Sequence, residues 1–190
     1  MPSKKEPLKL YEIKITLMEL APAIWRGVLV PRDIMLGDLH HVIQIAMGWE
    51  DEHLHEFEIG RKRYGPMMAD PFGSELALIN EAIVHLNGVA KPKAKFVYSY
   101  DFGDDWRHEI QIERELESES GKREVRCIAG ENACPPEDSG GPFGYPSLLD
   151  AVSDPQHEQH DEMLEWIGED FDPLRFDLTS TNRRLTKVKA

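Results

Sequence analysis

Residues 95–115 read KFVYSYDFGDDWRHEIQIERE, and apolar side chains stand at every second position on both sides of a short polar turn. A period of two is typical of a strand with one buried face. Gly103 and Asp104 lie at the bend, where glycine tolerates positive φ and aspartate bonds its own backbone. The stretch therefore predicts a β-hairpin.

The segments on either side extend this pattern into an α+β fold. Two further strands are predicted at 11–17 and 24–30, a helix at 36–49, and another strand at 53–60. Residues 61–73 and 127–146 are predicted as loops. A short helix is permitted at 74–86, and helices are predicted after Pro146, from Pro173 and near 179–187.

This order predicts an antiparallel or mixed sheet of about five strands, packed by helices and followed by C-terminal helices. The 190 residues are close to the size of one domain. We therefore expect a single domain over residues 1–190, with its core at about 8–186 and short basic tails at both ends.

The charge of the chain limits the classes of partner. Its net charge is −13, and lysines and arginines gather near the two ends, so the body is more acidic still. An acidic body repels a phosphate backbone, because nucleic-acid binding depends on Lys and Arg that neutralise phosphates. The expected partners are a small molecule, a peptide or a basic protein rather than nucleic acid.

The scarcity of cysteines and of long apolar runs indicates the cellular location. Two cysteines in 190 residues do not form a disulfide framework, and no apolar run approaches the length of a membrane span. The N-terminus has no signal-peptide core. We expect a cytoplasmic protein that does not enter the membrane.

The pair His53 and His55 is the first candidate for metal chemistry. Residues two apart on a strand share a face, about 6.5–7 Å apart, so two imidazoles could close on one ion such as zinc. The alternative is that both rings pack against aromatic residues of the core. His40 lies on or beside the apolar stripe of the 36–49 helix and is predicted to be a half-buried, hydrogen-bonded histidine.

The hairpin supplies the second group of candidates. Asp101 ends a strand beside aromatic residues, where an unpaired carboxylate is costly, so it is a candidate metal ligand. The candidate ligand-binding residues around it are Tyr100, Asp104, Trp106 and His108.

The 127–146 segment supplies the third group. Cys127 and Cys134 are candidate metal ligands, although their separation differs from the Cys-x-x-Cys pattern of structural zinc sites. Glu137 and Asp138 follow two prolines and are the candidate catalytic carboxylates. A surface loop with solvated acids remains the alternative.

Several familiar chemistries are absent from the sequence. It has no Gly-x-x-x-x-Gly-Lys-Ser/Thr loop, no dinucleotide fingerprint after a strand, no Gly-x-Ser-x-Gly elbow and no His-Glu-x-x-His. These absences argue against nucleotide-driven motors, Rossmann dehydrogenases and standard serine hydrolases.

Five blocks in a fixed order resemble the Ri-plasmid ORF-three-like family (plasmid pRiA-four-b ORF-three-like protein). The resemblance covers about residues 8–186 and implies one cytoplasmic α+β domain of unestablished function. The blocks are IWRGVLVP, LHHVIQIAMGWEDEHLHEFEIG, YSYDFGDDWRHEI, CIAGENACPPEDSGGPFGY and LEWIGEDFDPLRFDL.

Some relatives carry a label that suggests a transposon resolvase, and the residues do not support it here. A serine resolvase needs a nucleophilic serine among arginines and a basic DNA-binding helix-turn-helix, whereas this chain begins with a predicted hairpin and is acidic. The family pattern also implies a third cysteine where this chain has Ser139. That difference favours His and carboxylate ligands over thiolates.

Three hypotheses follow for function. The first is a binding module with a polar, His- and Asp-lined pocket at one end of the sheet. The second is a metal-dependent hydrolase, in which His and Asp hold the ion, and Glu137 or Asp138 is the general base. The third is an interaction module that docks a basic partner on its acidic surface. Whether the protein is an enzyme stays open at this point.

Overall fold

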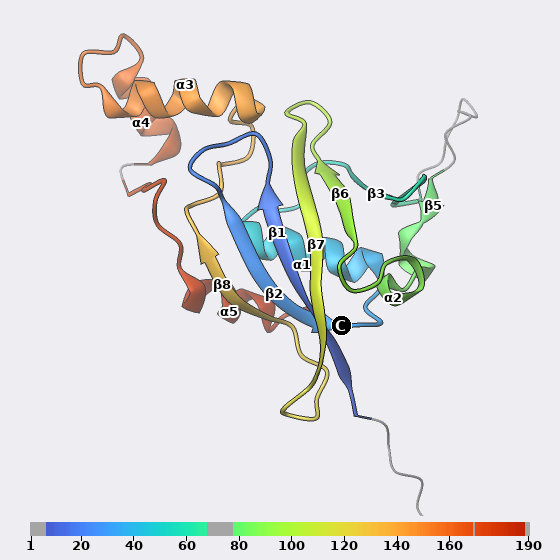
Figure 1. The fold of residues 1–190 in the computed structure, drawn as a ribbon. Coiled ribbons are helices and arrows are strands. Elements are labelled where there is room, and N and C mark those ends of the chain that lie inside the picture. The colour runs from blue at the N-terminus through green and yellow to red at the C-terminus, as the bar shows by residue number, and fades with distance from the viewer. Residues whose placement is uncertain (1–6, 68–77, 169, 189–190) are drawn as a thin grey trace, which may run out of the picture.

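The computed structural model describes residues 7–67, 78–168 and 170–188. In these residues eight strands form one mixed sheet, with helices beside it and after it in the chain (Figure 1). The strands are β1 (Lys9–Leu17), β2 (Trp25–Pro31), β3 (His55–Ile59), β4 (Lys62–Gly65), β5 (Ile79–Asn80), β6 (Lys95–Tyr100), β7 (Trp106–Glu117) and β8 (Arg126–Glu131). The helices are α1 (Leu36–Met47), the 3₁₀ turn η1 (Glu81–Ile83), α2 (Leu86–Val89), α3 (Gly141–Ser153), α4 (His160–Ile167) and α5 (Leu178–Leu185).

The predicted hairpin, β6 and β7, lies at the middle of the sheet. Tyr100 pairs with Trp106 and Tyr98 with His108, so the turn falls at 101–105 as the sequence predicts. The strand order is β5-β4-β3-β6-β7-β1-β2-β8, and every neighbouring pair is antiparallel except β4 with β5.

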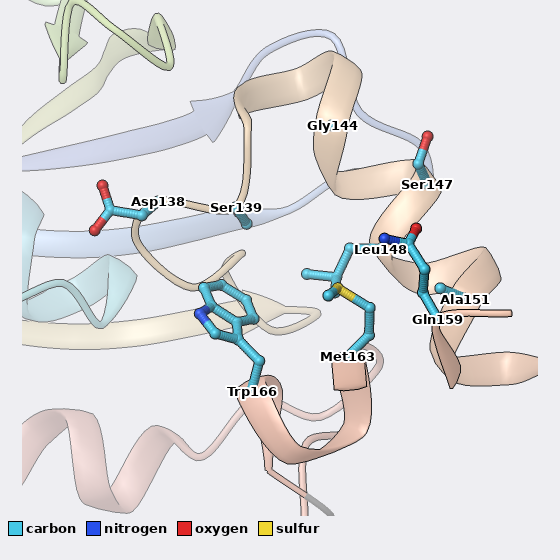
Figure 2. A pocket seen from close by; sticks show the side chains of 9 residues that line it. All are labelled: Asp138, Ser139, Gly144, Ser147, Leu148, Ala151, Gln159, Met163 and Trp166. Atoms are coloured by element: carbon cyan, nitrogen blue, oxygen red, sulfur yellow. The ribbon is translucent and has the colours of Figure 1, made fainter. Parts of the chain in front are cut away.

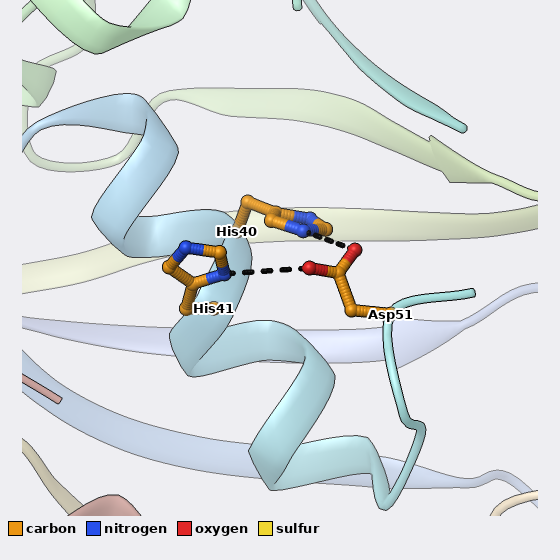
Figure 3. A group of neighbouring side chains, drawn as sticks. All are labelled: His40, His41 and Asp51. Carbon is orange, nitrogen blue, oxygen red and sulfur yellow. Dashed lines mark hydrogen bonds and ion pairs between the residues drawn. The ribbon is translucent and has the colours of Figure 1, made fainter. Parts of the chain in front are cut away.

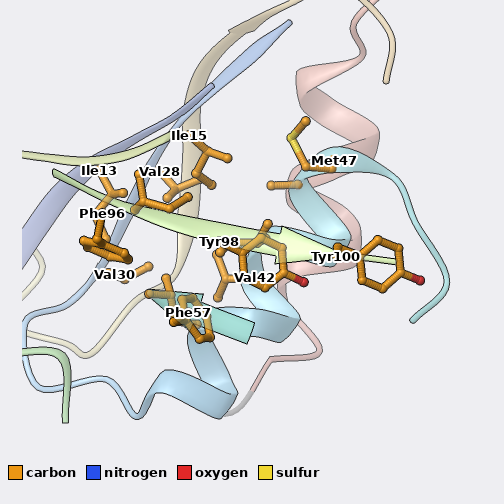
Figure 4. Packing of buried hydrophobic residues seen from close by; sticks show 14 of the residues in the cluster. Ile13, Ile15, Val28, Val30, Val42, Met47, Phe57, Phe96, Tyr98 and Tyr100 are labelled. Carbon is orange, nitrogen blue, oxygen red and sulfur yellow. The ribbon is translucent and has the colours of Figure 1, made fainter. Parts of the chain in front are cut away.

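Alternation gives the sheet one apolar face and one polar face. Ile13 and Ile15 are completely buried, whereas Lys14 between them is exposed. The apolar face packs against α1, whose Val42 and Met47 meet side chains from four strands (Figure 4). Burial of each large apolar side chain contributes roughly 1.5–3 kcal/mol, so this layer is the main stabilising element of the fold.

About five strands were predicted, whereas the described residues form eight. β4 and β8 fall in stretches predicted as loops, and β5 falls where a helix was permitted; residues 74–77 of that stretch lie outside the described residues. β8 was missed because it pairs with β2 along one side only, and Cys127 is its one buried residue. Such a strand carries little alternation for a pattern to detect.

The helices after β8 begin elsewhere than predicted. α3 starts at Gly141 and contains Pro146, which was predicted to open the helix. Pro142 occupies the first-turn position instead, where a missing N–H costs nothing. Pro173 begins a turn rather than a helix, with Asp172 accepting from the Leu174 N–H. The helix predicted near 179–187 is confirmed as α5.

α3 and α4 lie at the end of the sheet where the β1–β2 and β6–β7 strands turn (Figure 1). α5 packs near β8 and α1. Within the described residues, every helix is too short or too polar to cross a membrane.

Candidate metal-binding site

Three loops meet at the end of the sheet where β6 stops. They are the connection from α1 to β3, the β6–β7 turn and the loop that leads from β8 into α3. The Asp101 N–H donates to the Leu54 carbonyl at 2.8 Å, and the Glu50 N–H donates to Glu137 at 2.9 Å. These contacts bring the first loop to each of the other two.

Asp101 uses its two carboxylate oxygens differently. Its Oδ1 accepts the N–H groups of Gly103 and Asp104 at 2.9 and 3.3 Å, which stabilises the hairpin turn. Its Oδ2 lies 3.7 Å from His53 Nε2. The backbone of Asp101 has φ 56°, a left-handed conformation that aspartate tolerates better than most residues. One oxygen is therefore structural, and the other is directed at the imidazole.

His53 Nε2 lies between two carboxylates without a hydrogen bond. Asp138 Oδ1 is 3.3 Å away and Asp101 Oδ2 is 3.7 Å away. The nitrogen is buried and still makes no hydrogen bond of acceptable geometry. Buried polar atoms are normally paired, so this nitrogen calls for an explanation. One ligand atom from each of the three residues lies within 4.8 Å of the others, which is close enough for a single ion.

Tyr100 connects the loops that carry the site. Its hydroxyl accepts the N–H groups of Glu52 and His53 at 2.9 and 3.2 Å and donates to Glu137. Burial and the Glu137 carboxylate raise the pKa of this phenol, which therefore stays a donor. Both oxygens of Glu137 are thus occupied, by the phenol and by the Glu50 N–H.

A second contact joins the β6–β7 turn to the loop before α3. Asp104 Oδ2 accepts the Gly140 N–H at 3.0 Å. At Gly141, φ is +68°, and a Cβ would lie 2.2 Å from the Asp104 carbonyl oxygen. Only glycine lets the loop before α3 come this close to the β6–β7 turn. This close contact places Asp138 beside the turn.

A second group of possible ligands consists of His40, His41 and Asp51 (Figure 3), and both ring nitrogens of its buried member, His40, are hydrogen-bonded. His40 Nε2 lies 2.8 Å from Asp51 Oδ1, and His41 Nδ1 lies 3.7 Å from Asp51 Oδ2. Gln44 donates to the Tyr98 hydroxyl, which leaves that hydroxyl to donate to His40 Nδ1 at 2.8 Å. The Nε2 atom then carries the proton and donates to Asp51.

Burial keeps His40 neutral. It lowers the pKa of this imidazole to about 2, with neighbouring histidines acting in the same direction. The predicted hydrogen bonding of His40 is confirmed, but the side chain is fully buried rather than half-buried. This group differs from the first because its buried nitrogens have normal partners.

His55 is placed apart from His53. His53 precedes β3 and lies near Asp101, whereas His55 Nε2 lies 3.0 Å from Glu81, and its ring stacks on His40 with centroids 3.5 Å apart. The expectation of one ion between the two histidines presumed a strand that extends to residue 53, but β3 begins at His55. Among the described residues, no group of possible ligand atoms contains both.

Trp106 and His108 belong to the core rather than to a ligand-binding wall. Both are buried, and both rings lie within 6.0 Å of the Trp49 ring, measured between centroids. The Nδ1 atom of His108 lies 3.3 Å from the Tyr98 carbonyl, and burial lowers the pKa of the imidazole to about 3.

The two cysteines also lie outside the first group. Cys127 Sγ donates to the Ala129 carbonyl at 3.4 Å, and both thiols are free. Burial raises the pKa of each thiol, although Arg26 opposes the shift. Since the thiolate is the form that binds metal, neither thiol is prepared for that role.

From the sequence, the three residues of the first group were expected in one pocket at an end of the sheet, together with His55 and the two cysteines. His53 and Asp101 were predicted as ligands, and Asp138 was predicted as a catalytic carboxylate. The role of Tyr100 as a connector and the group around Asp51 were missed. Asp51 lies in an acidic stretch in which no residue pattern distinguishes it from Glu50 and Glu52.

Comparison with known proteins places the chain in a family. Residues 9–180 match the model of the family described as plasmid pRiA4b ORF-3-like protein. The uncharacterised protein y4hQ of Sinorhizobium fredii is 37% identical over 180 residues, which cover 94% of this chain and 91% of that protein. The crystal structure of MM3350 from Methanosarcina mazei, a protein of unknown function, superposes with a TM-score of 0.82 at 36% identity and covers 90% of this chain and 96% of that one. The chain belongs to the plasmid pRiA4b ORF-3-like family.

Proposed function

We propose that this protein binds a divalent transition metal, best matched by zinc, through His53, Asp101 and Asp138. The observation that carries the proposal is the buried His53 Nε2 atom, which faces two carboxylate oxygens and has no hydrogen bond. An ion between the three groups would satisfy the nitrogen and offset the repulsion between the two carboxylates.

The distances support a tetrahedral ion. With metal–ligand bonds of about 2.0–2.2 Å, tetrahedral geometry separates two ligand atoms by roughly 3.4 Å. The nitrogen–oxygen distances of 3.3 and 3.7 Å lie close to that value. A hydrogen bond would instead draw the atoms to about 2.7–3.2 Å. Imidazole and carboxylate are both ordinary zinc ligands.

The three loops also supply hydrogen bonds that hold the proposed ligand residues in place. Asp101 Oδ1 is fixed by turn amides, and the His53 backbone is held by Tyr100. Metal sites use such outer hydrogen bonds to orient their ligands. Because the parts that fix the ligands belong to three different loops, the site depends on the complete fold.

A metal-assisted hydrolase is the second candidate. Three protein ligands leave one position of a tetrahedral ion open, as in catalytic rather than structural zinc sites. A cavity bordered by Asp138 lies next to the group. The predicted base Glu137 already accepts two hydrogen bonds, so it would have to release one to take a proton.

The test is a zinc titration by calorimetry on protein stripped of metal, with manganese in parallel. Loss of an outer partner commonly costs 10–100-fold in affinity, so we expect His53→Ala and Asp138→Ala to lose about a hundredfold or more. His41→Ala is the matched control, because it changes a histidine that faces Asp51 in the second group. The proposal fails if the wild-type protein binds neither metal, or if His41→Ala abolishes binding while His53→Ala retains it.

A further inference from the structure

Three aromatic side chains of the described residues are well exposed. Phe102, Phe143 and Trp166 have exposed fractions of 52%, 87% and 48%. The tyrosines of the chain are all buried. Single exposed apolar residues are ordinary, but an exposed aromatic side chain that lines a cavity is a candidate contact for a ligand.

All three belong to the elements around the proposed metal site. Phe102 follows Asp101 directly in the β6–β7 turn. Phe143 stands in the first turn of α3, two residues after Gly141, which packs on the Asp104 carbonyl. Trp166 of α4 lines a cavity that Asp138 borders. We call these three residues the aromatic rim.

The cavity has a volume of about 330 Å³ and lies between α3, α4 and the loop before α3. Leu148, Met163 and Trp166 form its apolar part (Figure 2). In the same view the Asp138 carboxylate points away from these side chains, and Asp138 itself forms the border of the cavity. A molecule that fills the cavity and also reaches the metal must therefore pass over Asp138.

This inference rests on the proposed metal site. We propose that the ligand of that site is a small organic molecule with two separated parts. One part carries an oxygen that binds the open position of the metal. The other part is an aromatic or branched apolar group that lies in the α3–α4 cavity against Trp166. A short chain joins the two parts across Asp138.

Size and charge support this class of ligand. The cavity volume falls at the lower end of the range of about 300–1,000 Å³ for small-molecule sites. The chain carries a net charge of −13, and the metal ligands include two carboxylates. Anionic groups other than the metal-binding one would be repelled, so the apolar part is expected to carry no negative charge.

The experiment measures binding of hydroxamic acids to the zinc-loaded protein by calorimetry. The probes are acetohydroxamic acid and hydroxamic acids with a phenyl ring on alkyl linkers of increasing length. Burial of a phenyl ring predicts about tenfold or tighter binding at the best linker length, relative to acetohydroxamic acid. Trp166→Ala should remove that advantage while zinc affinity stays unchanged.

Leu174→Ala is the matched control, since Leu174 is exposed to 66% and lies outside the lining of this cavity. It should keep the full advantage of the phenyl probes. Equal affinity for all probes would overturn the inference, as would an advantage that survives Trp166→Ala. Because zinc binding is measured first and separately, failure of the metal site itself would be recognised before any probe is added.

Discussion

Asp101 Oδ2 lies 3.7 Å from His53 Nε2, while Oδ1 of the same carboxylate holds the turn that follows it. The negative charge of Asp101 therefore serves the proposed metal site, whereas its acceptor oxygen Oδ1 stabilises the turn. Asparagine keeps the shape and the tolerance of left-handed backbone but removes the charge.

Asp101→Asn should accordingly separate folding from metal binding. We expect stability within about 0.5 kcal/mol of the wild type, because the amide oxygen still accepts from Gly103, and at least tenfold weaker zinc binding. Urea unfolding and zinc titration measure the two quantities. Unchanged zinc affinity in the folded variant would remove Asp101 from the ligand set.

Tyr100→Phe should weaken both the fold and the site. The hydroxyl accepts two backbone N–H groups and donates to Glu137, so its removal leaves three partners without a bond. We expect a loss of about 1–3 kcal/mol in the free energy of unfolding, with weaker zinc binding. Denaturant unfolding and calorimetry check both.

Tyr145→Phe is the matched control for this change. The Tyr145 hydroxyl is buried and has no hydrogen bond, so its removal should leave stability unchanged or raise it. Equal losses in the two variants would show that the Tyr100 connections do not stabilise the loops.

Gly141→Ala should displace the loop that carries Asp138. Its Cβ would lie 2.2 Å from the Asp104 carbonyl oxygen, in addition to the strain of alanine at positive φ. Gly168→Ala shares the positive φ but would meet nothing within 4 Å. We expect about 1–2 kcal/mol of destabilisation at Gly168 from backbone strain alone.

The loss at Gly141 should be larger, and only there should zinc affinity fall as well. Thermal unfolding of the two variants, with and without zinc, distinguishes the effects. Equal melting temperatures and equal zinc affinities would mean that the contact between the turn and the loop does not position the site.

Acid should destabilise the protein through its buried histidines. The folded-state pKa of His108 is lowered to about 3 from the ordinary 6.5, so below pH 6.5 the unfolded chain takes up a proton that the folded chain does not. The stability that neutral His108 provides is present above pH 6.5 and is lost as the pH falls toward 3. Between pH 7 and pH 5 this amounts to about 2 kcal/mol.

His108→Leu should reduce the loss of stability over that pH range by about 2 kcal/mol, measured by urea unfolding at each pH. His40, with a pKa lowered to about 2, acts in the same direction and stays in place in this variant. A pH dependence identical to that of the wild type would show that His108 is protonated in the folded protein.

The centre of the fold was predictable because its residues alternate. β1, β7 and α1 each bury one face of a regular pattern, and β2 is a short apolar run that is buried almost throughout. β8 and α3 were misplaced, since an edge strand and a helix with an internal proline depend on tertiary contacts that no local pattern contains. The sequence thus predicted the central strands and α1 better than the edge strand β8 and the helix α3.

The sequence predicted that the segments of His53, Asp101 and Asp138 meet at one end of the sheet, but it also assigned His55 and the two cysteines to that site. Asp101 was predicted as a metal ligand because an unpaired carboxylate beside aromatic residues is costly, whereas its Oδ1 is in fact paired with N–H groups of the turn. Its position next to His53 follows from pairing between β3 and β6. The separation of His53 from His55 depends on where β3 begins, which alternation does not fix to one residue. Asp138 is brought to the site by the close packing of Gly141 against the Asp104 carbonyl, a contact between segments far apart in the chain.

The most direct test of the metal site is a crystal structure of the protein grown with zinc, with anomalous data recorded at the zinc edge. We expect one strong anomalous peak about 2.0–2.2 Å from His53 Nε2 and from one oxygen each of Asp101 and Asp138. A peak at His40, His41 and Asp51 instead, or zinc-grown crystals without a peak near His53, would contradict it.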